Sequence, residues 1–376
     1  MNIAVNTRLL QKDRLEGIGS VIYNTMKRIT IQHPEHHFFF LFDRDYDDEF
    51  IFSDNITPLI ISPQARHPIL FYWWFEHSIP SILKAIKADL FISPDGYVSL
   101  SSKVKTLSVI HDLNFEQYPQ HFPWIIKKYY KYYFPRFAHR ADRIATVSEF
   151  SKRDIITRYG IEENKIDVIY NGVNEAFKPL SSAVIEETRK KYSDGIPYFI
   201  FVGSIQPRKN IKNLLIAFEL FRNNYPQPFK LLIVGTKKWW TNELEKTLKE
   251  MKHREDVILT GRVEEDELLK LMGSAYAMTY VPFYEGFGIP ILEAFNCQVP
   301  VITSNVTSMP EVANGAAILV DPQDTQSIAS SMMRIVEDVN LAKELIAKGI
   351  VRKNNFNWDK SADSLWNSVI KLGIKE

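Results

Sequence analysis

Short apolar segments alternate with amphipathic stretches along the whole chain. In the first half, apolar runs predict strands at Ile3–Asn6, Phe38–Phe42, Leu90–Ile92, Thr106–Ile110, Ile144–Val147 and Val168–Tyr170. Apolar residues at helical spacing predict helices at Gly19–Ile31, Ile79–Lys87, Phe122–Ala138 and Ser148–Tyr159. Strands that alternate with helices in this way are typical of α/β domains built on a parallel sheet.

The alternation breaks between Asn174 and Pro197, where prolines, serines and a glycine predict a linker that holds a short helix, Val184–Tyr192. The second half then predicts strands at Tyr198–Val202, Lys230–Val234, Val257–Leu259, Ala277–Val281, Val299–Ile302 and Ala317–Val320. We therefore predict an α/β protein of two Rossmann-like, doubly wound domains. The expected bounds are 1–175, a linker at 176–196, a second domain at 197–356 and a final helix within 357–376. Ligands of such sheets bind at the carboxyl ends of the strands.

Composition narrows the class of protein further. The chain has 376 residues, 45% of them hydrophobic and 24% charged, with a net charge of +1, so no broad basic field favours nucleic acid as a partner. Cys297 is the sole cysteine, which is compatible with a reducing compartment. The first residues, Met1–Val5, resemble a buried strand rather than a signal peptide, and no apolar run approaches the roughly 20 residues of a membrane span. We expect a cytoplasmic protein that touches a membrane only at its inner surface.

A glycine loop between two carboxylates is the most informative motif. Glu285 and Glu293 flank Gly286-Phe287-Gly288, after an apolar strand and at the start of a predicted helix. The start of a helix favours anions, because backbone N–H groups and the helix dipole point toward it. Carboxylates accept hydrogen bonds from hydroxyl groups, so the arrangement suits a sugar joined to a diphosphate. The alternative is an ordinary strand–turn–helix corner.

Two adjacent cations, Arg208 and Lys209, follow the strand Tyr198–Val202 and its Gly203 turn. At the carboxyl end of a strand, such a pair can neutralise a diphosphate, and a nucleoside diphosphate needs that neutralisation when it leaves. A solvated surface pair is the alternative. His111 also ends a predicted strand, and Gly17 and Gly19 lie between the first strand and the first helix, where glycine allows the backbone to approach a ligand.

The segment Glu285–Glu293 resembles the E-x7-E signature of retaining glycosyltransferases of family four, which have the GT-B fold. Other matching segments follow in the family's order: Gly17-Ile18-Gly19, His111-Asp112, Val147–Ser151, Tyr170–Val173, Val202–Ser204, Arg208–Asn210, Gly261–Val263 and Pro310–Val312. The resemblance spans nearly the whole chain. It implies two domains that face each other across a cleft, the first on the acceptor side and the second holding the nucleotide sugar, with the final helix returning to the first domain.

The resemblance also implies roles for single residues. It assigns catalysis to His111, Glu285, Arg208 and Lys209. It assigns donor binding to Gly17, Gly19, Gly203, Arg262, Val263, Gly286, Phe287, Gly288 and Glu293. The donor is a nucleoside diphosphate sugar and the acceptor a carbohydrate or a lipid-linked sugar.

The implied reaction is front-face transfer of a hexose with retention of configuration, in polysaccharide or glycolipid synthesis. The pattern leans toward mannose from GDP-mannose. Two alternatives stay open, a nucleotide-sugar 2-epimerase of the same fold and a non-catalytic module that binds sugar nucleotides.

Two further segments have competing interpretations. Asp43-Arg44-Asp45 has the form of a metal-binding D-x-D, but the run Asp43–Glu49 is interpreted as a solvated acidic loop, and we expect neither a catalytic metal nor a cofactor. The stretch Trp124–Phe134 mixes aromatic residues with lysines. It fits an interfacial amphipathic helix that makes a peripheral membrane contact, or a core-facing helix with a solvated lysine stripe.

Overall fold

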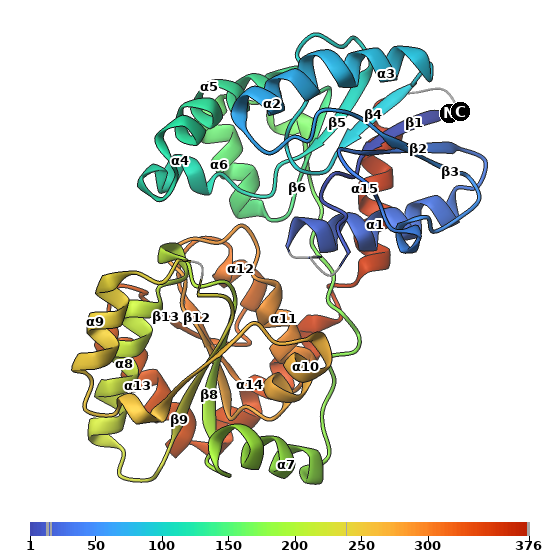
Figure 1. Cartoon of the computed structure of the whole chain (residues 1–376). Coiled ribbons are helices and arrows are strands. Elements are labelled where there is room, and N and C mark those ends of the chain that lie inside the picture. Colours follow the sequence, from blue (N-terminus) through green and yellow to red (C-terminus); the bar gives the residue numbers. More distant parts are fainter. Residues whose placement is uncertain (13–14, 16, 238, 374–376) are drawn as a thin grey trace. The chain divides into compact units, whose positions relative to one another are not determined.

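The computed structural model describes residues 1–12, 15, 17–237 and 239–373. The chain forms two compact units (Figure 1). The first unit combines Met1–Gly172 with Asn357–Glu376, and the second is the continuous segment Val173–Phe356.

Within the described residues, the first unit contains a seven-stranded parallel sheet in the order β3-β2-β1-β4-β5-β6-β7. The strands are β1 (Asn2–Asn6), β2 (His37–Phe42), β3 (Ile56–Ile60), β4 (Leu90–Ser93), β5 (Lys105–Val109), β6 (Arg143–Thr146) and β7 (Ile166–Val168). The sequence pattern misses β3, which contains Pro58. An edge strand tolerates proline because its outer N–H groups need no partner in the sheet.

Helices cover both faces of this sheet. The helices of the first unit are α1 (Ile18–Gln32), α2 (Pro68–Trp73), α3 (Ile79–Ala85), α4 (Asn114–Gln117), α5 (Trp124–Arg140), α6 (Glu149–Tyr159) and α15 (Trp358–Ile370). Successive residues of β1 alternate between two cores: Ile3 and Val5 join the core of α1 and α15, and Ala4 joins the core of α2, α3 and α5. This period of two explains why the strands are apolar throughout.

Across its described residues the second unit has a six-stranded parallel sheet in the order β10-β9-β8-β11-β12-β13. Its strands are β8 (Tyr198–Val202), β9 (Lys230–Val234), β10 (Val257–Gly261), β11 (Ala277–Tyr280), β12 (Val301–Ser304) and β13 (Ile318–Val320). Its helices are α7 (Ser182–Ser193), α8 (Ile211–Asn224), α9 (Asn242–Glu250), α10 (Glu265–Gly273), α11 (Ile289–Asn296), α12 (Met309–Ala313), α13 (Thr325–Glu337) and α14 (Val339–Lys353). Helices α8, α9 and α13 lie on one face of the sheet, and α10 and α11 on the other (Figure 1). Strand order reverses between β8 and β11, and such a switch point opens a crevice at the carboxyl ends of the strands.

Residues 176–196, expected as a linker, are instead part of the second unit. Their helix α7 packs against α10, and Arg189 Nε donates a hydrogen bond to the Ser274 carbonyl oxygen at 2.9 Å. Leu180 lies so close to Gly273 that a Cβ at that glycine would come within 2.7 Å of it. These contacts join residues far apart in the sequence, so the local abundance of proline and glycine could not reveal them.

Candidate active site

The glycine loop after β11 has the geometry expected from the sequence. Strand β11 is buried, and helix α11 begins at Ile289, directly after Gly288. Gly288 has φ +104°, and a Cβ at this position would come within 2.7 Å of Met309 Cε. Glycine is therefore required both by the backbone conformation and by the close packing on α12. No side chain caps the start of this helix at Gly288.

Ser308 holds this loop in place. Its hydroxyl, which is buried, lies 2.9 Å from the Glu285 carbonyl oxygen and 3.1 Å from the Phe287 carbonyl oxygen. The Phe287 ring is buried against Phe356, with ring centroids 5.7 Å apart. The sequence analysis missed Ser308, because nothing in the local pattern shows that a serine 23 residues away folds back onto the loop.

Three charged side chains meet at the switch point between β8 and β11. Glu285 follows β11, and its Oε1 lies 2.5 Å from Lys209 Nζ and also accepts a hydrogen bond from Arg208. The side chains of Glu285, Arg208 and Lys209 are only 10%, 17% and 11% exposed. A solvated surface pair is thereby ruled out for Arg208 and Lys209, and the structure brings both cations together with Glu285 at the strand ends.

Electrostatics fix the charge of this cluster. Burial raises the pKa of Glu285, but the charges of Arg208 and Lys209 outweigh burial and hold that pKa below its usual value. Tyr280 joins the cluster, because Lys209 Nζ donates to its hydroxyl oxygen. Burial and the Glu285 charge raise the pKa of Tyr280 well above its usual value, so the phenol stays neutral. Two cations thus share one carboxylate, and the three side chains carry a net positive charge.

Two glycines bring the neighbouring loops together. Gly203 follows β8 with φ +146°, and a Cβ there would lie 3.8 Å from Lys209 Cε. Gly235 follows β9 with φ +151°, and a Cβ there would overlap the Gly203 carbonyl oxygen. Gly203 was among the predicted donor-binding residues, but Gly235 was not. A glycine at the end of an apolar strand could have indicated Gly235 as well.

Glu293 lies in α11, eight positions beyond Glu285, and is partly buried. Burial, together with the negative charge of Glu265, raises the pKa of Glu293 to about 7. Within the described part of the chain, no hydrogen bond reaches the Glu293 carboxylate. The two carboxylates of the motif therefore differ. Glu285 is ionised and paired with cations, whereas Glu293 gains or loses its proton near pH 7.

Gly261, Arg262 and Val263 lie at the end of β10, on the same edge of the sheet. Gly261 has φ +72°, and its carbonyl oxygen accepts a hydrogen bond from Gly235 N at 2.9 Å. Arg262 is exposed and Val263 is partly exposed. Main-chain groups of this loop thus lie near the β9 turn.

In the first unit, His111 follows β5 beside the switch point between β1 and β4. Its Nε2 lies 2.8 Å from the Pro94 carbonyl oxygen, and burial lowers its pKa, so the neutral ring predominates at neutral pH. The carbonyl partner assigns the proton of the neutral ring to Nε2, which leaves Nδ1 as an acceptor. Gly19 is the second residue of α1, and a Cβ there would come within 2.8 Å of the Leu9 carbonyl oxygen. Gly17 has φ +48°, and a Cβ there would meet no atom of the described residues within 4 Å.

The interpretation of Asp43–Glu49 as a solvated loop is wrong for Asp43. That residue is buried, and its carboxylate binds Arg44 and accepts a hydrogen bond from Ala65 N at 3.0 Å. Asp45 is exposed. The ion pair between neighbouring residues satisfies the buried charge, which a count of acidic residues cannot show. In the described ranges, no group of three or more His, Cys, Asp or Glu side chains is arranged to hold a metal ion.

Helix α5, which contains Trp124–Phe134, has one buried side and one exposed side. Tyr129 and Phe134 are buried in the core of the first unit, whereas Trp124 and Tyr132 are exposed. No helix in the part of the chain that the structure describes is both long and apolar enough to cross a membrane.

Each of the two units is doubly wound on a parallel sheet, and one switch point holds a cationic cluster and a glycine loop. Together these features define a GT-B type of glycosyltransferase. Residues 15–177 match the family described as Glycosyltransferase Family 4, and residues 184–352 match Glycosyl transferases group 1. The chain belongs to family four of the GT-B glycosyltransferases.

Related proteins support this assignment. The O-antigen chain mannosyltransferase RfbU of Salmonella typhimurium is 30% identical over 319 residues, covering 83% of this chain and 82% of the relative. The O-antigen chain mannosyltransferase B of Escherichia coli is 28% identical over 287 residues, covering 76% and 75%. Among solved structures, a sucrose-phosphate synthase from Thermosynechococcus elongatus superposes with a TM-score of 0.79 at 18% identity, covering 99% of both chains. That structural likeness concerns the fold alone.

Proposed function

We propose that this glycosyltransferase moves a hexose from a nucleoside diphosphate sugar to a hydroxyl of a carbohydrate or lipid-linked acceptor, with retention of configuration and without a metal. We propose GDP-mannose as donor and polysaccharide assembly of the O-antigen kind as the process. The two relatives described above, both named O-antigen chain mannosyltransferases, support these choices.

The observation that carries the proposal is the cluster of Arg208, Lys209 and Glu285. Its net positive charge lies next to a helix start that no side chain caps, which suits a diphosphate. As the bond between the anomeric carbon and the phosphate oxygen breaks, negative charge grows on the diphosphate, and the two cations stabilise it. Such fixed cations can do the work that a metal ion does at other diphosphate sites.

We propose that the acceptor oxygen attacks the anomeric carbon from the face that the phosphate leaves. The acceptor proton then passes to the departing phosphate oxygen, so no protein base is required. Glu293, whose carboxylate has no hydrogen-bond partner in the described residues, is assigned to the ribose hydroxyls. We assign His111 to the transferred sugar on the family resemblance alone.

The test is an assay of purified protein with a panel of nucleoside diphosphate sugars, with and without an acceptor glycan, in a chelator. We expect transfer from GDP-mannose that survives the chelator, with the product in the anomeric configuration of the donor. Transfer that stops in the chelator and returns with manganese would refute the metal-free mechanism. Donor isomerisation without an acceptor would instead reveal a 2-epimerase, and nucleotide binding without turnover a binding module.

A further inference from the structure

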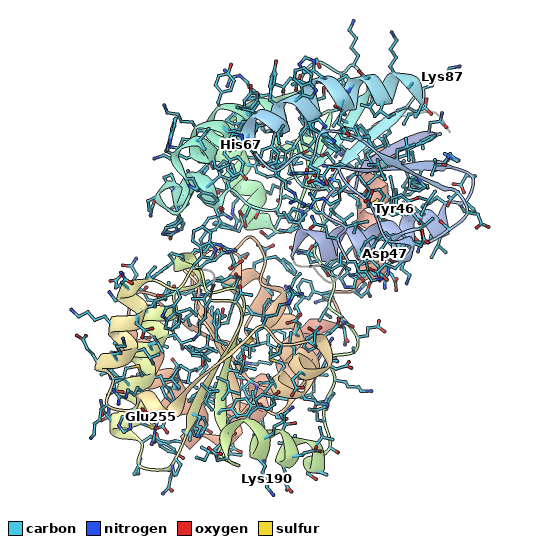
Figure 2. All side chains as sticks on the ribbon, viewed as in Figure 1. Tyr46, Asp47, His67, Lys87, Lys190 and Glu255 are labelled. Atoms are coloured by element: carbon cyan, nitrogen blue, oxygen red, sulfur yellow. The ribbon has the colours of Figure 1, made fainter. Side chains whose placement is uncertain are left out.

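Helix α2 presents an unusual number of large apolar side chains to solvent. Ile69, Leu70, Tyr72 and Trp73 are 68%, 36%, 43% and 54% exposed on a helix of six residues. His67, labelled in Figure 2, caps the start of this helix through a 3.4 Å contact with Ile69 N. Exposed apolar side chains that gather in one place indicate an interaction site.

Helix α5 extends this apolar surface. Trp124 and Tyr132 on α5 are 67% and 53% exposed. Tyr133 joins the two helices, because its ring centroid lies 6.3 Å from that of Tyr72 and 4.9 Å from that of Tyr132. The inner faces of the two helices also meet, through Phe71 and Tyr129. We call the exposed set the α2–α5 surface, and it consists of Ile69, Leu70, Tyr72, Trp73, Trp124 and Tyr132.

Helix α5 gives the α2–α5 surface a net basic character. Helix α5 contains no acidic residue, and Lys128 and Lys131 are exposed on it. Lys128 Nζ lies 4.8 Å from the Trp124 ring centroid, and the Arg136 guanidinium lies 3.6 Å from that of Tyr132. The chain as a whole carries a net charge of only +1, so this basic character is local.

One acidic residue, Glu76, lies three positions beyond the end of α2. Its two carboxylate oxygens accept hydrogen bonds from Leu100 N at 2.7 Å and Ser101 N at 3.1 Å, which hold the carboxylate at that loop. Lys128, Lys131 and Arg136 outnumber this single negative charge.

We propose that the α2–α5 surface docks the first unit on an anionic lipid membrane. Tryptophan and tyrosine prefer the boundary between lipid and water, and exposed lysines are attracted to acidic headgroups. Ile69, Leu70 and Trp73 enter the headgroup layer, while Lys128 and Lys131 face its charge. The combination of large apolar side chains with a net positive charge matches a lipid surface better than a second copy of this chain, which would bring the same positive charge.

The test is sedimentation of the purified chain with sucrose-loaded vesicles. One set contains phosphatidylglycerol and phosphatidylcholine, and the other contains phosphatidylcholine alone. The assay needs no donor or acceptor, so its outcome is independent of the transfer reaction proposed above. We expect wild-type protein to pellet with the anionic vesicles at low salt, and to pellet much less at high salt because screening weakens attraction between exposed charges.

Two pairs of variants separate the contributions. Ile69→Ser with Trp73→Ser removes the inserting side chains, and Lys128→Glu with Lys131→Glu reverses the charge. Each pair should weaken vesicle binding at least tenfold, and because all four side chains are exposed or partly exposed, thermal melting should show that the fold is intact.

Matched controls come from α1 and α15, on the opposite face of the same sheet. Ile31→Ser with Ile370→Ser, and Lys27→Glu with Lys360→Glu, make the same chemical changes at exposed positions. These controls should bind vesicles like wild type. The proposal is wrong if wild type fails to pellet with anionic vesicles, if the α2–α5 variants pellet unchanged, or if those variants only dissolve a dimer of the chain.

Discussion

Each unit places a largely enclosed arginine beside one carboxylate at the carboxyl edge of its sheet, but the number of cations that share this carboxylate differs. In the first unit, Arg8 pairs with Asp95 at 2.6 Å, and the guanidinium lies 4.6 Å from the Tyr97 ring centroid. In the second unit, Arg208 and Lys209 share Glu285. One pair is neutral and enclosed by aromatic rings, whereas the other cluster keeps a positive charge. The comparison teaches that the balance of charge, rather than the presence of an arginine, distinguishes the proposed diphosphate site.

The largest effect is expected from breaking the neutral pair. Arg8→Met would leave the Asp95 carboxylate buried without its cation, and we expect a loss of about 3–5 kcal/mol in the free energy of unfolding. Denaturant titration measures this loss. Arg8→Met combined with Asp95→Asn removes both charges and should recover more than half of it. If the single variant is as stable as wild type, the pair has no structural role.

Breaking the cationic cluster should affect turnover more than folding. Arg208→Ala removes a contact that strengthens as the diphosphate leaves, so we expect kcat/KM to fall by roughly 30- to 1000-fold, equivalent to about 2–4 kcal/mol. Steady-state kinetics with the donor measure this change. A variant with wild-type kinetics would show that Arg208 does not stabilise the leaving group.

Replacing Glu293 should stabilise the folded chain but weaken nucleotide binding. Its pKa is about 7 in the folded chain, against an ordinary value of 4.5, so its ionisation opposes folding at pH 8 and not at pH 4. Glu293→Gln should therefore raise the free energy of unfolding by about 1–2 kcal/mol at pH 8, with no gain at pH 4. The same variant should bind the nucleoside diphosphate more weakly at pH 8. Equal gains in stability at both pH values would contradict the raised pKa.

The smallest effect is expected from replacing Glu285, and it tests the balance of charge in the cationic cluster. In the unliganded site, Glu285 occupies the cations that a diphosphate needs, so Glu285→Gln should bind the bare nucleoside diphosphate more tightly, by roughly 3- to 10-fold, or about 1 kcal/mol. Isothermal titration measures the affinity. Transfer should still decline, because the carboxylate assigned to the sugar is lost. Weaker binding by the variant would mean that Glu285 and the diphosphate do not compete for Arg208 and Lys209.

Local patterns were sufficient for much of the fold and for the outline of the site. The bounds of β8 and β9 agree with the apolar runs, since buried parallel strands are apolar on both faces. The position of the glycine loop between β11 and α11 also followed from the sequence. The roles of the site residues stay predictions.

Features that depend on contacts between residues far apart in the chain could not be predicted from the sequence. Ser308 reaches the glycine loop from another segment, and Gly235 matters only because Gly203 lies against it. Asp43 lies in an acidic run, which suggested that it is solvated. Its ion pair with Arg44 and a hydrogen bond from Ala65 N make its burial possible. Helix α2 was missed because it is short and apolar on both its buried and its exposed side.

Helix α15 determines the order in which the chain can fold during synthesis. Its Ala362, Leu365 and Trp366 complete a core that also contains Ile3 and Ile22, so the face of the first sheet that carries α1 stays partly uncovered until residues beyond 357 leave the ribosome. The second unit is continuous and needs nothing from this helix, so we expect it to fold first. The nascent first unit would meanwhile expose an apolar sheet face, which makes it a natural client for a chaperone that holds chains during translation.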